Sequence, residues 1–94
     1  MNKQICHYIR TYSEIKNMQY AHKVAYFAES TEKGIVLSLV HIDKNGEFLE
    51  RCLCPNLSLD GAKNMMLFLC ENSVGRENWI YVLQDYGVEF LLIE

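Results

Sequence analysis

The stretch GIVLSLVHIDKNGEFLERCLC, residues 34–54, determines most of the fold. Two largely apolar runs flank the tetrapeptide DKNG (43–46), which is typical of a type I turn closed by a glycine in a left-handed conformation. This pattern predicts an antiparallel hairpin over residues 35–54. A loop made of the last three turn residues would place Asp43 opposite Glu47 and so set the register of the hairpin.

In this register both faces of the hairpin are mainly apolar. A sheet with one face in water alternates polar and apolar residues more regularly. We therefore expect both faces to be covered, by helices or by another copy of the chain. The predicted pairs are Ile42/Phe48, Val40/Glu50, Ser38/Cys52 and Val36/Cys54 on one face, and His41/Leu49, Leu39/Arg51 and Leu37/Leu53 on the other.

Two further strands are predicted before the hairpin, over residues 4–12 and 19–29, from period-two alternation and from aromatic and β-branched residues. After the hairpin, Pro55 ends the strand because it cannot donate a ladder hydrogen bond. Ser58 then fits the N-cap of a helix over residues 59–73.

Gly75 is predicted to close this helix, and Gly87 to end a second helix over about 76–86. For the tail, residues 88–93, a short last strand is favoured over another helical turn. Strands followed by helices indicate an α+β fold rather than α/β. The expected architecture is a single domain of residues 1–94, with an antiparallel sheet of about four strands followed by two C-terminal helices.

Composition limits the classes of function. The chain has 94 residues, 50% of them hydrophobic, and a net charge of −3, which argues against direct nucleic-acid binding. No stretch resembles a signal peptide or a membrane span, so a cytoplasmic location with four reduced cysteines is expected. Such a rich apolar content also favours self-association.

The cysteines Cys52 and Cys54 form the nearest approach to a chemical motif. Side chains two residues apart on a strand point the same way, so the two thiols would share a face. Zinc sites, however, usually separate paired cysteines by two to four residues and add a second pair, which this sequence lacks. We therefore expect no cofactor, no metal and no enzymatic activity, with a metal-binding or thiol-based function at this pair as the alternative.

The second predicted helix is the strongest candidate for partner binding. It carries residue types enriched at interface hot spots beside acidic side chains. Residues 71–94 contain five acidic residues against Arg76 alone, a net charge of −4. The competing interpretation is that the tryptophan and the second tyrosine only pack the helix on the sheet. The candidate partner-binding residues are Trp79, Tyr81, Asp85, Tyr86 and Glu89.

Residues 56–90 also resemble the C-terminal half of a family of short uncharacterised clostridial-type bacterial proteins. The similarity lies in a polar S-x-D helix start at Ser58 and Asp60, a helix end at Leu69-Cys70-Glu71-Asn72, and an acidic final helix with Val82 and Asp85. This resemblance implies no activity.

The function expected from the sequence is therefore a small non-enzymatic protein that binds another macromolecule, with a homo-oligomer such as a homodimer as one form of association. One concrete version is a phage-type, anti-CRISPR-like inhibitor of a nucleic-acid-binding host defence enzyme. Such an inhibitor would present acidic surface to a basic groove.

Overall fold

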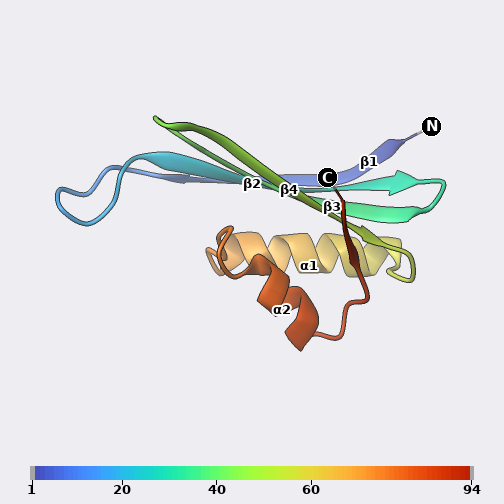
Figure 1. Cartoon of the computed structure of the whole chain (residues 1–94). Coiled ribbons are helices and arrows are strands. Elements are labelled where there is room, and N and C mark those ends of the chain that lie inside the picture. Colours follow the sequence, from blue (N-terminus) through green and yellow to red (C-terminus); the bar gives the residue numbers. More distant parts are fainter. Residues whose placement is uncertain (1, 94) are drawn as a thin grey trace.

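The computed structural model describes residues 2–93 and has an α+β fold, as the sequence predicted. Five strands form one antiparallel sheet in the order β1-β2-β3-β4-β5, and both helices lie on the same side of it (Figure 1). The short last strand brings the sheet to five strands. The elements are β1 (Lys3–Tyr12), β2 (His22–Thr31), β3 (Gly34–Asp43), β4 (Gly46–Cys54), α1 (Leu59–Glu71), α2 (Trp79–Asp85) and β5 (Leu91–Ile93).

The two tight turns of the sheet have the same construction. At the β2–β3 turn the Thr31 hydroxyl accepts a hydrogen bond of 3.2 Å from the Lys33 N–H. At the β3–β4 turn the Asp43 carboxylate accepts one of 2.8 Å from the Asn45 N–H. Each turn ends in a glycine with positive φ, +138° at Gly34 and +129° at Gly46, a conformation that side-chain-bearing residues rarely adopt.

The predicted hairpin register was wrong by one residue. Asp43 pairs with Gly46 rather than with Glu47, and Val40 pairs with Leu49. The reason is that Gly46 itself joins the ladder, which leaves only two residues in the loop. Because side chains alternate along a strand, this shift exchanges the faces of β4 relative to β3. The cysteines of β4 therefore lie on the same face as Leu37.

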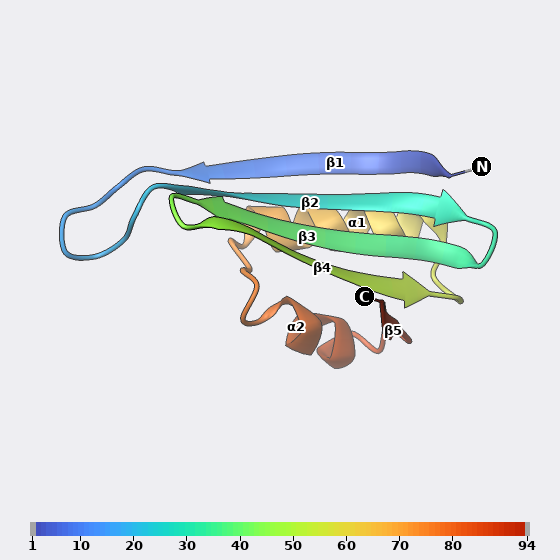
Figure 2. The same cartoon turned by 45° about the horizontal axis from the view of Figure 1, so that its top comes forward.

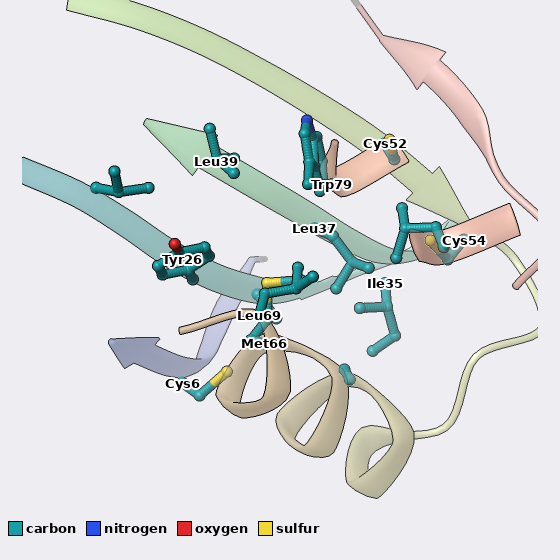
Figure 3. Close-up of a cluster of buried hydrophobic side chains, with 14 residues drawn as sticks. Cys6, Tyr26, Ile35, Leu37, Leu39, Cys52, Cys54, Met66, Leu69 and Trp79 are labelled. Atoms are coloured by element: carbon teal, nitrogen blue, oxygen red, sulfur yellow. The ribbon is translucent and has the colours of Figure 1, made fainter. Parts of the chain in front are cut away.

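The core lies between the sheet and the helices (Figure 3). The predicted N-cap is confirmed, since the Ser58 Oγ accepts a hydrogen bond of 3.0 Å from the Gly61 N–H. From there α1 turns three side chains, those of Ala62, Met66 and Leu69, into the core. The fully enclosed members of the core also include Val24, Tyr26, Ala28, Leu37, Leu39, Cys52, Cys54, Trp79 and Leu83.

The end of α1 differs from the prediction. The helix stops at Glu71, and Ser73, with φ +54°, takes the left-handed position expected for Gly75. The Val74 N–H then donates a bond of 2.9 Å back to the Leu69 carbonyl, which is the Schellman arrangement. From the edge strand β1, the Arg10 guanidinium donates to the carbonyls of Cys70 and Glu71, at 3.1 and 3.3 Å.

The starts of β2 and α2 also differ from the predicted ones. The second strand starts at His22 rather than at residue 19, because residues 15–19 form a separate turn with Asn17 at φ +65°. This connection projects beyond the end of the sheet in Figure 2. The second helix starts at Trp79 rather than at 76, and its predicted end at Gly87, with φ +71°, is confirmed.

One face of the sheet has no covering element within residues 2–93. We expected both faces to be covered, but both helices lie on the same side, opposite to this open face (Figure 1). Val40 is 9% exposed there and does not belong to the core cluster beneath the helices. The apolar residues whose register places them on the open face are Ile9, Ala25, Phe27, Val36, Val40, Ile42, Leu49, Leu53, Leu91 and Ile93.

Candidate partner-binding surface

The helix α2 is fixed to the sheet by its first residue. Trp79 has no exposed surface, and its indole Nε1 donates a hydrogen bond of 2.7 Å to the Glu50 carboxylate on β4. One turn later Leu83 is equally buried. Trp79 was predicted to contact a partner, but its ring lies among the core side chains beside Cys52 (Figure 3). Its contribution to a binding surface is therefore to hold α2 in place.

The opposite side of α2 presents an acidic and aromatic stripe. Tyr81 and Asp85 are four residues apart in α2, a spacing that puts both side chains on one side of the helix, and Glu77 lies in the turn just before the helix, four residues ahead of Tyr81. All three are exposed, and 64% of Tyr81 is accessible to solvent. We call these three residues the α2 stripe. A tyrosine between two carboxylates offers an apolar ring and a hydroxyl within a negative surface.

Tyr86 and Glu89 follow α2 directly and contact α1 and the connection before it. Tyr86 is 63% exposed and contacts the ring of Phe68 edge-on, with ring centroids 5.3 Å apart. Glu89 accepts a hydrogen bond from the Asn56 side chain, in the connection between β4 and α1. Four of the five predicted residues are thus exposed, Tyr81 and Asp85 on α2 and Tyr86 and Glu89 just after it, and their role in partner binding stays a prediction.

The cation nearest to the stripe in the sequence is engaged elsewhere. The Arg76 guanidinium lies over the ring of Phe48 on β4, 5.3 Å from its centroid. This contact is a cation–π interaction. The exposed carboxylates of Glu77, Asp85 and Glu89 therefore dominate the charge of this surface. Sequence reasoning placed Glu77 beside the predicted aromatic residues but left it out of the candidate set, and it missed the contact of Phe68 with Tyr86.

The thiols of Cys52 and Cys54 do share a face, as predicted, but that face is the core. Both are fully buried. Burial raises the pKa of Cys52 to about 12 and that of Cys54 to about 11, so both thiols hold their protons at neutral pH. Among residues 2–93, no three His, Cys, Asp or Glu side chains come together as metal ligands would. This environment suits apolar packing rather than a thiolate function.

A row of stacked rings, which was not predicted from the sequence, occupies the end of the sheet near the β1–β2 connection. Tyr12 stacks on His22 at 4.3 Å, and His22 stacks on His41 at 4.9 Å between ring centroids. The imidazole of His41 also bonds the Asp43 carboxylate at 3.2 Å. The Asn45 N–H and, to a smaller extent, His41 lower the pKa of Asp43. These bonds and stacks fix the orientation of both histidines.

No helix within the described residues is long and apolar enough to cross a membrane. Comparison of the chain with protein-family models, with curated proteins and with solved structures finds no match. The resemblance of residues 56–90 to short clostridial-type proteins stays a prediction.

Proposed function

We propose that this protein is a non-enzymatic binding protein that engages a basic macromolecular partner through the α2 stripe, Tyr86 and Glu89. The observation that carries the proposal is the exposure of Tyr81 between Glu77 and Asp85. Tyrosine is enriched among the residues that dominate binding energy. Its acidic neighbours would attract a positively charged surface and accelerate the encounter.

The buried anchor of α2 supports this proposal. A binding surface gains affinity when its side chains are held in place before the partner arrives, because less entropy is lost on binding. Trp79 and Leu83 fix α2 from below, and the Phe68 ring supports Tyr86 from the side. The aromatic residues of this surface therefore project from a fixed backbone.

Among the possible partners, a protein with a basic groove that binds nucleic acid has the charge that best complements this acidic surface. We therefore retain, as the specific form of the proposal, a cytoplasmic phage-type inhibitor of a nucleic-acid-binding defence enzyme. Exposed carboxylates at Glu77, Asp85 and Glu89 would occupy part of the site that phosphates otherwise fill. The four cysteines of the chain are free thiols, which is consistent with a reducing compartment.

Affinity capture from native bacterial lysate tests the binding surface. The bait is the tagged chain as wild type, as Tyr81→Ala and as Tyr20→Ala. Tyr20 is a matched control because it is 62% exposed, compared with 64% for Tyr81, and lies in the distant β1–β2 connection. We expect mass spectrometry to find a basic protein that wild type and Tyr20→Ala retain and Tyr81→Ala loses. Equal retention by all three baits would refute the role of α2.

Charge is tested separately. Asp85→Lys should weaken binding of the captured protein about tenfold or more, whereas Glu14→Lys, an equal change in net charge at an exposed site in the β1–β2 connection, should have little effect. Wild-type binding should also weaken between low and high salt. For the inhibitor form, the wild-type chain should displace labelled DNA or RNA from the captured protein. Binding without displacement would contradict inhibition but not the binding surface.

A further inference from the structure

We propose that a second copy of this chain covers the open face, so that two sheets pack face to face about a two-fold axis that runs along β3. This inference is independent of the α2 surface, because the two surfaces lie on opposite sides of the sheet (Figure 1). It assigns the uncovered apolar side chains of the molecule to a symmetric interface.

The open face has the character of an interface rather than of a solvated sheet. Ile9, Ile42 and Leu49 lie there at 58%, 41% and 50% exposure, and Val40 between them is almost enclosed by its neighbours. These positions are adjacent in the ladder, since Val40 pairs with both Ala25 and Leu49. A contiguous apolar surface of this kind is uncommon on a monomeric protein.

The part of the face that the axis superposes has the size of a weak dimer interface. Strands β2 to β4, which lie over one another in the two copies, have nine or ten residues each. With about 3.3 Å per residue and about 4.8 Å between strands, they form a surface of about 33 by 14 Å, or about 460 Å². Two such faces would bury about 900 Å² in total, which suits a weak, reversible dimer.

The charges at one end of the face are self-complementary. Ile42 of β3 pairs with Lys23 on one side and with Glu47 on the other. Both charged side chains are exposed, and within residues 2–93 neither has an ionic partner. Since β3 is the central strand, a two-fold axis along it would place Lys23 of each copy over Glu47 of the other. Both new ion pairs would form from one symmetry operation.

The same axis matches the apolar rows. It places Val40 and Ile42 each over its own equivalent, and Ala25 over Leu49 of the second copy, within the small rotation that aligned sheets usually show. On β2 to β4 this face carries two cations, Lys23 and Arg51, and two anions, Glu29 and Glu47. A partner of one charge sign would leave one of these sets opposed by like charge, whereas a second copy supplies both signs.

The first experiment measures mass in solution by light scattering or sedimentation across a concentration series. The wild-type chain should reach twice the 11.0 kDa mass of one copy, with a Kd at or below about 100 µM. Leu49→Lys should stay at the single-copy mass at concentrations where wild type is dimeric. The matched control is Leu59→Lys, a similarly exposed leucine at the start of α1, 56% against 50%, which should dimerise as wild type does.

Circular dichroism and urea unfolding at high dilution should show that Leu49→Lys is folded, since its side chain packs against no core residue. If it is unfolded, the charge variants below provide the test. A wild-type chain that stays monomeric to millimolar concentration would overturn the proposal. So would dimerisation that Leu49→Lys leaves intact.

The second experiment tests the axis by charge reversal. Lys23→Glu and Glu47→Lys should each weaken dimerisation about tenfold or more, because each change creates two like-charge contacts in the symmetric dimer. The double variant Lys23→Glu/Glu47→Lys should recover most of the wild-type affinity. If either single variant dimerises as tightly as wild type, or if the double variant shows no recovery, the axis along β3 is overturned.

Discussion

The indole of Trp79 donates its N–H to the carboxylate of Glu50 across 2.7 Å, and this bond joins the start of α2 to the middle of β4. Glu50 lies on the helix-covered face opposite Leu39, among core residues. A carboxylate in such surroundings is stabilised by a donor, and a buried indole N–H requires an acceptor. The pair therefore determines where α2 attaches.

Removing the indole N–H should destabilise the fold through this bond. Trp79→Phe keeps an aromatic ring but leaves the Glu50 carboxylate without its donor, and we expect it to lower the free energy of unfolding by about 1.5–3 kcal/mol. Urea denaturation of Trp79→Phe, Glu50→Leu and the double variant gives the coupling energy. The expected value is about 1–3 kcal/mol, and a coupling near zero would contradict the assigned role.

The two turn glycines should respond differently to alanine. Both Gly34→Ala and Gly46→Ala place a side chain at positive φ, at a cost of about 1–2 kcal/mol. A Cβ at Gly34 would also lie 2.9 Å from the Cα of Pro55, whereas a Cβ at Gly46 meets nothing within 4 Å. We expect Gly34→Ala to lower the thermal midpoint clearly more than Gly46→Ala. Equal shifts would mean that Pro55 moves away without cost.

The buried thiols should make the fold sensitive to alkaline pH. The ordinary thiol pKa is 9.0, and burial raises the pKa to about 12 at Cys52 and about 11 at Cys54. Above about pH 9 the unfolded chain loses these protons while the folded chain keeps them. The free energy of unfolding should therefore fall by up to about 1.4 kcal/mol per pH unit for each thiol. This fall extends over the pH range between the ordinary pKa of the thiol and its raised pKa in the folded chain.

Urea denaturation between about pH 8 and about pH 10.5 measures this slope. Cys52→Ala is the comparison, since it should be less stable at the lower pH because of the cavity but should lose stability less steeply with pH. A slope that matches wild type would show that Cys52 does not keep its proton in the folded state.

Ser38 is a buried hydroxyl whose removal should cost nothing. It has no exposed surface, and its Oγ has no hydrogen-bond partner within the described residues. An unsatisfied buried polar group costs about 1–3 kcal/mol, so Ser38→Ala should leave the free energy of unfolding unchanged or raise it.

Thr31→Val is the contrasting variant for Ser38→Ala. The Thr31 hydroxyl donates to the Gly34 carbonyl at 2.7 Å and accepts from Lys33, so its loss should cost about 1 kcal/mol. Chemical denaturation of both variants under the same conditions gives the comparison. A clear loss of stability in Ser38→Ala would show that the Ser38 hydroxyl has a partner.

Local chemistry made several elements predictable from the sequence. The cap at Ser58 and the helix end at Gly87 depend on a few adjacent residues, and both are present. The end of α1 was harder to predict, because Ser73 occupies the left-handed position although Gly75 is close by. Its tertiary support comes from Tyr26, whose hydroxyl donates a bond of 2.6 Å to the Val74 carbonyl. The sequence of the helix alone cannot predict this contact, because Tyr26 lies on β2.

The faces of the sheet were harder to predict, because a single residue in one turn decides them. Whether the loop holds two residues or three depends on the backbone at Gly46, and that choice moves Leu49 from one side of the sheet to the other. The candidate partner-binding surface was likewise only partly predictable. Helical spacing correctly predicted that Tyr81 is exposed. Only tertiary packing decides that Trp79 is enclosed while Tyr86 is not.

The bond from Arg10 to the end of α1 can form only late in synthesis. The last turn of α1 contains no basic residue, and the cation that meets its carbonyls comes from about sixty residues earlier in the chain. At a synthesis rate of about 5–20 residues per second, β1 would leave the ribosome several seconds before α1 is complete. Until then the strand has only β2 beside it, with its inner face bare. A molecule that shields nascent strands would have this interval in which to act.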